Sequence, residues 1–200
     1  MEPPPPPPPA PYDYQVQWCG FSGTQRLQLP EMRLADISTL SFRVATESTS
    51  EMVVVGKNDG VARLEFYMQS KKIGYWSQYD GSRLVDSQCP PEVTTARYDI
   101  LPDRLRISVT SESVSRTVEF PAIDERELQA SHVLYVGAYQ DSSYIAFVGE
   151  LYSLQIYHGG MIAMNLIPVV LENEGCFFDT INEIFYKNEG TGDLIIGPRI

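Results

Sequence analysis

The residues that could do chemistry are few and scattered in this chain. Acidic clusters occur at 124–127 and 172–174, and both are typical of turns or helix surfaces. The two histidines are His132 and His158, and His158 stands beside a Gly-Gly turn. The sequence contains no Gly-x-Ser-x-Gly nucleophile elbow, and no strand motif that would place two carboxylates around a glycosidic bond. It therefore predicts a protein that is not an enzyme and has no catalytic residues.

The cysteines give no sign of a metal site. Cys19, Cys89 and Cys176 lie far apart, and no Cys/His cluster has metal-ligand spacing. Cys19 follows Trp18 and Cys176 precedes Phe177, so we expect both to be small buried apolar groups. Neither a metal nor a cofactor is predicted.

Two segments combine aromatic rings with amide or carboxylate groups, the mixture with which β-sandwiches bind sugars. A ring packs against the apolar face of a sugar, while the polar groups bond to its hydroxyls. The predicted glycan-binding residues are Tyr75, Trp76, Tyr79, Asp80, Tyr139 and Asp141. The alternative is that Tyr75 and Trp76 simply pack in a sheet, because aromatic residues favour strands.

The elements that must position these residues are almost all strands. Apolar residues alternate with polar ones at Leu40, Phe42 and Val44, at Leu105, Ile107 and Val109, and at Tyr152, Leu154 and Ile156. This period of two indicates half-buried strands. Residues 176–179 and 184–187 are expected to form strands around a turn at 180–183, followed by a turn at 188–192 and a last strand at 194–196. One short helix is expected within 121–130.

Many short strands with at most one short helix predict an all-β fold. The expected architecture is a two-sheet antiparallel sandwich. A chain of 200 residues, 43% of them hydrophobic, suits one domain with a substantial core. The longest apolar runs, such as 52–55 and 167–171, are too short to cross a bilayer, so no membrane insertion is expected.

The first residues differ from the rest. Residues 1–11 form a predicted proline-rich N-terminal arm, and 12–200 form the domain. Such an arm adopts an extended polyproline II conformation, and it is expected either to dock onto a partner or to act as a passive spacer. The docking prolines are Pro3, Pro4, Pro5, Pro6, Pro7, Pro8 and Pro9. The arm has neither the positive flank nor the apolar core of a secretory signal.

The net charge of −11 argues against nucleic acid as a partner. Binding a phosphate backbone requires clustered basic residues that release counterions. The 15 basic residues are instead dispersed along the sequence and outnumbered by 26 acidic ones.

Both ends of the chain resemble concanavalin A-like (LamG-type) jelly-roll domains of bacteriophage structural proteins and bacterial surface proteins. The opening match lies at 14–29 and carries Ser-Gly-Thr-Gln at 22–25. The closing matches are Gly149, Leu151, Tyr152, Ser153, Ile156, Tyr157, Ile167, Pro168, Val169, Gly175, Asp179, Asn182, Phe185, Tyr186, Asn188, Gly190, Thr191 and Gly192. The resemblance implies a jelly roll. Many such domains bind calcium through loop carboxylates, for which Asp59, Asp80 and Asp141 would be the contributors, but their pattern gives no support for it.

Together these observations predict a non-catalytic bacteriophage virion structural protein, a head or tail fibre or a decoration component. It is expected to assemble through its proline-rich arm with other virion proteins or with itself, and to bind host-surface glycans. It would be made in the host cytoplasm and reside in the virion. The alternative is a bacterial surface or secreted carbohydrate-binding module, located at the cell surface or outside it. A glycoside hydrolase-like enzyme is a distant third.

Overall fold

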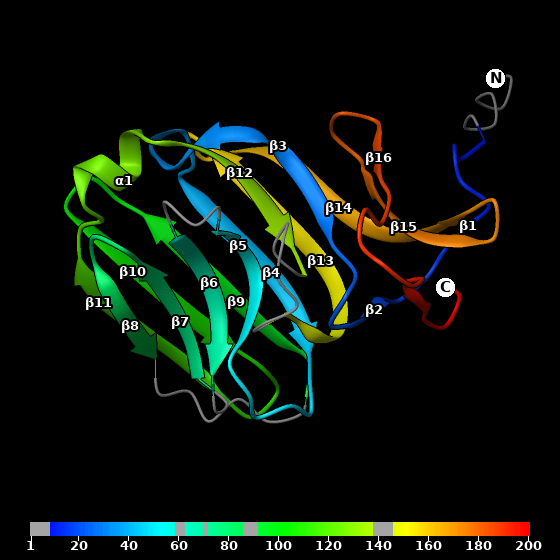
Figure 1. Ribbon diagram of the computed structural model, residues 1–200, viewed down its shortest axis with the longest axis horizontal. Coiled ribbons are helices and arrows are strands. Elements are labelled where there is room, and N and C mark those ends of the chain that lie inside the picture. Colours follow the sequence, from blue (N-terminus) through cyan, green and yellow to red (C-terminus); the bar gives the residue numbers. More distant parts are fainter. Residues whose placement is uncertain (1–8, 59–62, 70–71, 86–91, 138–145) are drawn as a thin grey trace, which may run out of the picture.

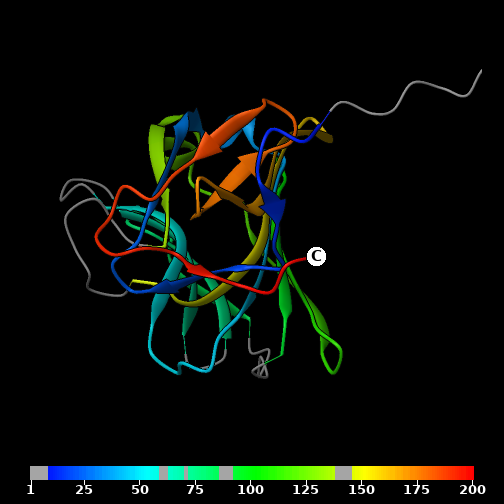
Figure 2. The same cartoon turned by 90° about the vertical axis from the view of Figure 1, so that its right-hand side faces the viewer.

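The chain folds into two antiparallel β-sheets that pack face to face. The computed structural model describes residues 9–58, 63–69, 72–85, 92–137 and 146–200. Figure 2 shows the two layers, with the cyan and teal strands on one side and the green strands on the other. This confirms the predicted all-β sandwich, which fits a jelly-roll-like fold.

The large sheet contains 11 strands within the described residues. Its main path runs through β11 (Ser115–Pro121), β10 (Arg104–Thr110), β9 (Thr94–Ile100), β4 (Thr39–Ala45), β13 (Val148–His158), β14 (Met161–Leu171), β15 (Glu174–Asp179) and β16 (Ile184–Tyr186). Three short strands extend it, namely β1 (Tyr14–Gln15) beside β14, β2 (Cys19–Ser22) beside β13, and β17 (Ile195–Ile196) beside β2.

The small sheet contains six strands within the same residues. They follow the order β3 (Leu27–Arg33), β12 (Ser131–Val136), β5 (Met52–Asn58), β6 (Arg63–Gln69), β7 (Lys72–Ser77) and β8 (Gly81–Val85). A 3-10 turn, η1 (Leu34–Asp36), leads from β3 to β4. In Figure 1, β1 and the C-terminus lie at the end of the sandwich opposite α1 (Glu125–Gln129).

Helix α1 lies inside the segment where the sequence predicts one. Asp124 is its N-cap, and its carboxylate accepts a hydrogen bond from the backbone N–H of Arg126. This cap satisfies one of the N–H groups that the first turn of a helix leaves without a partner. The expected helix at 121–130 is confirmed, although the helical part is shorter than that segment.

The alternating residues fill one continuous core between the sheets. Leu40, Phe42 and Val44 of β4 are buried, and so are Leu154 and Ile156 of β13. Their neighbours in sequence point to the outer face of the large sheet, because successive side chains of a strand leave opposite faces. The predicted period of two is thus the pattern that separates core from outer face.

Two tight turns hold β13, β14 and β15 in register. Gly159 and Gly160, both with positive φ, connect His158 to its partner Met161. Glu172 and Asn173 connect β14 to β15 and also have positive φ. Two-residue hairpin loops of this kind match the right-handed twist of the strands they join.

The two ends of the chain close on each other through the side chain of Gln25. Its Oε1 accepts a hydrogen bond from the backbone N–H of Ser22 at 2.8 Å, and its Nε2 donates to the carbonyl of Asp193 at 3.0 Å. Gln25 is only 3% exposed, so these bonds replace water that cannot reach it. The opening segment is thereby tied to the residues before β17.

The turn at 188–192 completes this closure. The Asn188 side chain accepts hydrogen bonds from the backbone N–H groups of Arg26 and Gly190, both at 2.9 Å. A Cβ at Gly190 would overlap the carbonyl oxygen of Thr24, so only glycine allows the two backbones to approach this closely. The Thr24 hydroxyl donates to the carbonyl of Thr191 at 2.7 Å. Several residues that carry the LamG-type resemblance therefore have a structural role.

Asp179 and Asn182, which also carry the resemblance, form the turn between β15 and β16. The Asp179 carboxylate accepts hydrogen bonds from the backbone N–H groups of Asn165 and Ile181, both at 3.0 Å, and from the Asn182 amide at 2.6 Å. Asp179 is fully buried. It fixes the hairpin predicted around 180–183.

Replacing Gln25 tests the closure. In Gln25→Ala we expect the free energy of unfolding to fall by about 1–3 kcal/mol, because a buried side chain and its hydrogen bonds to the backbone of Ser22 and Asp193 are lost. The measurement is urea-induced unfolding followed by tryptophan fluorescence. Gln78→Ala, at an exposed position, is the matched control and should change stability by less than about 0.5 kcal/mol. Equal effects of the two substitutions would contradict the role of Gln25.

Cys19 and Cys176 are buried free thiols, as predicted. Burial raises the pKa of Cys19 to about 12 and that of Cys176 to about 11, so both remain protonated near neutral pH.

Among the described residues, no helix has both the length and the apolar character needed to span a membrane.

Candidate ligand-binding face

Polar and aromatic side chains form a continuous surface on the outer face of the large sheet. It is built by the outward-pointing residues of four neighbouring strands, β9, β4, β13 and β14. We call this surface the polar face, made of Thr95, Arg97, Asp99, Thr39, Ser41, Arg43, Tyr152, Ser153, Gln155, Tyr157 and Asn165. These residues come from three distant parts of the sequence, and strand pairing brings them together.

Strand register aligns the polar face into rows. In the middle row, Arg97 lies opposite Ser41, Ser41 opposite Gln155, and Gln155 opposite Asn165. Neighbouring strands are about 4.8 Å apart, so each row presents a polar group at that spacing, which is comparable to the length of a sugar ring. A row of this kind suits a linear polymer lying across the strands.

The middle row is held together by its own hydrogen bonds. The Gln155 amide donates to Asn165 Oδ1 at 3.0 Å, and the Asn165 amide donates to the Thr180 hydroxyl at 2.7 Å. The Tyr157 hydroxyl donates to Gln155 Oε1 at 3.1 Å. These bonds fix the ring of Tyr157 and the orientation of both amides, which lowers the entropy lost when a ligand binds.

A second fixed group lies next to Tyr157. Arg97 Nε donates to Asp99 Oδ1 at 2.8 Å, and the Thr39 hydroxyl donates to the same oxygen at 2.9 Å. The Arg97 guanidinium lies 5.9 Å from the centre of the Tyr157 ring, within the range of a cation–π contact. The Arg97 guanidinium and the Tyr157 ring therefore form a pair on this part of the polar face.

Tyr152 and Arg43 form the corresponding pair on the other side of the middle row. The Arg43 guanidinium lies 5.2 Å from the ring centre of Tyr152, whose hydroxyl donates to Glu150 at 2.8 Å. Burial and the neighbouring Glu150 carboxylate raise the pKa of Tyr152 to about 12. Tyr152 is thus a neutral hydrogen-bond donor throughout the physiological pH range.

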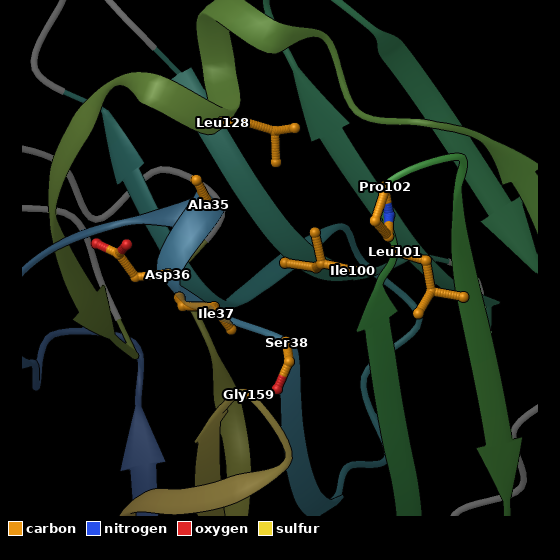
Figure 3. Close-up of a pocket in the computed structure, with 9 residues that line it drawn as sticks. All are labelled: Ala35, Asp36, Ile37, Ser38, Ile100, Leu101, Pro102, Leu128 and Gly159. Carbon is orange, nitrogen blue, oxygen red and sulfur yellow. The ribbon is translucent and has the colours of Figure 1, made fainter.

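A pocket of about 280 Å³ lies at the end of the polar face, between η1, the β9–β10 turn and α1. Figure 3 shows that Ile37, Ile100 and Leu128 give it an apolar lining. Its polar side chains are already bonded. The Ser38 hydroxyl donates to the carbonyl of Tyr157 at 3.0 Å, and Asp36 holds the Arg33 guanidinium with both oxygens. The pocket can accept an apolar group but offers little to orient it.

Tyr75 and Asp80, two of the residues predicted to bind glycans, are interior groups. Tyr75 is fully buried, and its hydroxyl donates to Asp80 at 3.2 Å. Burial raises the pKa of Tyr75 far above its usual value. The Asp80 side chain is 7% exposed and holds Arg83 at 2.6 Å. Tyr75 therefore packs in the sheet, which was the alternative drawn from the sequence, and its ring is not accessible to a sugar.

Asp80 also joins the two sheets at one edge of the sandwich. Its carboxylate accepts a hydrogen bond from the backbone N–H of Asp124, and Arg83 donates to the carbonyl of Pro121 at 2.6 Å. Pro121 ends β11 of the large sheet, whereas Arg83 belongs to β8 of the small one. The Asp80–Arg83 pair thus clamps the start of the α1 segment onto the β7–β8 hairpin.

Of the other predicted glycan-binding residues, the structure describes Trp76 and Tyr79. Trp76 lies half-buried on the face of β7 opposite Tyr75, beside Val53 and Tyr67. Tyr79 is 41% exposed and lies 4.3 Å below the Arg126 guanidinium. Tyr139 and Asp141, like Asp59, lie outside the described residues. Of the arm, Pro9 is described and exposed, and Pro3 to Pro8 lie outside the described residues.

A buried pair of titratable groups lies beneath α1. The Glu127 carboxylate and the His132 imidazole are 0% and 1% exposed, and Glu127 Oε1 lies 3.1 Å from His132 Nε2. Within the described part of the chain, neither carboxylate oxygen accepts a hydrogen bond of good geometry. His132 Nε2 also lies 3.3 Å from the carbonyl oxygen of Glu127, so the imidazole contacts both the side chain and the backbone of that residue.

Sequence reasoning missed the polar face because it searched for binding residues in loops. The polar residues that alternate with the predicted core residues could have indicated this face. Ser153 and Gln155 stand between Tyr152, Leu154 and Ile156, which the sequence assigns to the core. Tyr152 is in fact on the outer face, because β13 has an irregularity in register between Leu151 and Ser153. Such an irregularity shifts the side chains that follow it.

Comparisons with known proteins do not assign this chain to a family. No protein-family model matches this chain, and no curated protein matches it. Among solved structures the chain is similar to Scytalido-glutamic peptidase, in a crystal structure with a peptide-based transition-state analog. The similarity covers 89% of this chain and 100% of that chain, with 9% sequence identity and a TM-score of 0.41.

The sequence predicts that the chain is not an enzyme, whereas the similar structure is that of a peptidase, so that prediction is not retained. A likeness at this identity and TM-score transfers no residue, substrate or reaction to this chain. The molecule is thus an antiparallel two-sheet sandwich with a polar outer face, and its family is not assigned by these matches.

Proposed function

We propose that this chain is a bacteriophage virion protein that binds glycans of the host surface through the polar face. The observation that carries the proposal is the middle row of Arg97, Ser41, Gln155 and Asn165, flanked by the ring of Tyr157. It replaces the loop site predicted from the sequence.

The chemistry of the polar face suits a sugar better than other ligands. Amide and hydroxyl groups both donate and accept hydrogen bonds, as sugar hydroxyls do. Tyr152 and Tyr157 present rings of the kind that pack against the apolar face of a pyranose. A nucleic acid would require a strongly basic surface, whereas here Asp99 lies beside Arg97 and neutralises it.

The virion assignment rests on the resemblance at the two ends of the chain. Those residues close the sandwich, as Gln25 and Asn188 do, so they support a shared architecture more than a shared ligand. The proline-rich arm is proposed to attach the domain to a neighbouring virion protein or to a second copy. The glycan site is independent of that attachment and can be tested on the isolated chain.

A glycan array with the purified chain tests the proposal. We expect specific glycans to be bound, and Gln155→Ala and Tyr157→Ala to weaken binding on the order of tenfold or more, because each removes a fixed hydrogen-bonding group or ring. Tyr79→Ala is the control, since Tyr79 is also exposed but lies outside the polar face. Thermal unfolding of each variant confirms that the fold is retained.

Two outcomes would reject this site. If no glycan on the array is bound by the unmodified chain, the proposed function is wrong. If Tyr79→Ala abolishes binding while Gln155→Ala and Tyr157→Ala do not, the glycan site lies elsewhere on the chain.

A further inference from the structure

Arginines gather on the outer face of the large sheet although the whole chain carries a net charge of −11. The arginines with outward positions on β4, β9 and β10 are Arg43, Arg97, Arg104 and Arg106. Most of them face carboxylates. Arg97 lies 2.8 Å from Asp99, Arg106 lies 2.8 Å from Glu119, and Arg104 lies 3.6 Å from Glu119.

Arg43 differs from these three arginines. It is exposed, and its guanidinium stacks over Tyr152, but no carboxylate of the described residues forms an ion pair with it. Its five N–H donors form a planar fork that matches a carboxylate or sulfate in a bidentate geometry. Tyr152 holds that fork in place, because its own hydroxyl is bonded to Glu150.

The row of the polar face that contains Arg43 has polar groups that are available to bind a ligand. Register places Thr95 and Ser153 on either side of Arg43. In the described part of the chain, neither hydroxyl has a side-chain partner, whereas the middle row is bonded internally through Gln155. The row thus presents one cation between two free hydroxyls, all fixed on rigid strands.

The geometry points to an acidic glycan as the ligand of the polar face, with Arg43 binding its carboxylate or sulfate and with Thr95 and Ser153 bonding to hydroxyls of the same sugar. This inference rests on the proposed function and names the substrate class of the same site. Because the net charge of the chain is −11, an anionic ligand gains no long-range attraction. Its selection therefore depends on the local contacts of Arg43.

The test is direct binding of three polymers to the full chain by isothermal titration calorimetry. Polygalacturonate supplies carboxylates, dextran sulfate supplies sulfates, and dextran supplies neither. We expect one of the acidic polymers to bind more tightly than dextran. Arg43→Gln should weaken that binding roughly tenfold to a hundredfold, the range for losing hydrogen bonds to a charged group. Arg43→Lys should recover only part of the affinity, because a lysine keeps the charge and loses the fork.

Arg126→Gln is the matched control. Arg126 also lies over a tyrosine ring, that of Tyr79, but it is paired with Asp124 at 2.8 Å and lies outside the polar face. It should leave polymer binding unchanged. If neutral glycans bind as tightly as acidic ones and Arg43→Gln has no effect, the acidic class is wrong while the proposed function stands. If the chain binds no glycan at all, both are wrong.

Discussion

Asp80→Ala is expected to destabilise the chain by about 3–5 kcal/mol, because it leaves the Arg83 guanidinium nearly buried without its carboxylate. The Arg83 and Asp80 side chains are 10% and 7% exposed and lie 2.6 Å apart. The loss also removes the acceptor for the Tyr75 hydroxyl and for the Asp124 backbone N–H. Urea-induced unfolding followed by circular dichroism measures the change.

The chain contains a matched control for this substitution. Arg33 and Asp36 form an ion pair with the same spacing of three residues, but their side chains are 51% and 44% exposed. Asp36→Ala should therefore change the stability of the chain little, because water screens an exposed ion pair. Similar losses of stability in Asp36→Ala and Asp80→Ala would show that burial does not determine how strongly the Asp80–Arg83 pair stabilises the chain. A stable Asp80→Ala variant with lost glycan binding would instead restore Asp80 as a ligand-binding residue.

His132→Leu is the second substitution with a large expected effect. It removes the imidazole that lies 3.1 Å from the fully buried Glu127 carboxylate. The carboxylate would then be buried without that partner, so we expect a loss of about 3–5 kcal/mol in the free energy of unfolding. Chemical denaturation at neutral pH gives this value.

A double variant distinguishes the effect of breaking the Glu127–His132 pair from the effect of lost packing. Glu127→Leu combined with His132→Leu replaces both polar groups with apolar ones, an exchange that is often neutral or stabilising. We expect the double variant to be at least about 2 kcal/mol more stable than His132→Leu alone. If the double variant is less stable than the single one, the pair is not the reason for the loss.

The elements of this fold could be predicted from the sequence because local rules decide them. Alternation at Leu40, Phe42 and Val44 predicts a half-buried strand, and the structure buries all three. The helix within 121–130 follows from the charged residues around Ile123 and Leu128, and α1 begins after the Asp124 cap. The hairpin around 180–183 likewise depends on residues close in sequence, such as Asp179 and Asn182.

The site could not be located in this way, since neighbouring residues of a strand face opposite sides. Tyr75 and Trp76 are adjacent in sequence, yet Tyr75 is in the core and Trp76 is on the outside of the small sheet. They cannot form one binding platform. Asp80 lies between β7 and β8 and bonds to the nearby Arg83, but its bond to the backbone of Asp124 depends on a distant part of the chain.

The sequence by itself determined many of the strands, the short helix α1 and, apart from Tyr152, which of the alternating residues named above are buried, because these follow from side-chain alternation and turn chemistry. Only the tertiary structure decided that β4 lies between β9 and β13. That order brings Arg43 between Thr95 and Ser153. The reason is physical: pairing between distant strands is chosen by the packing of the whole core, and no local pattern encodes it.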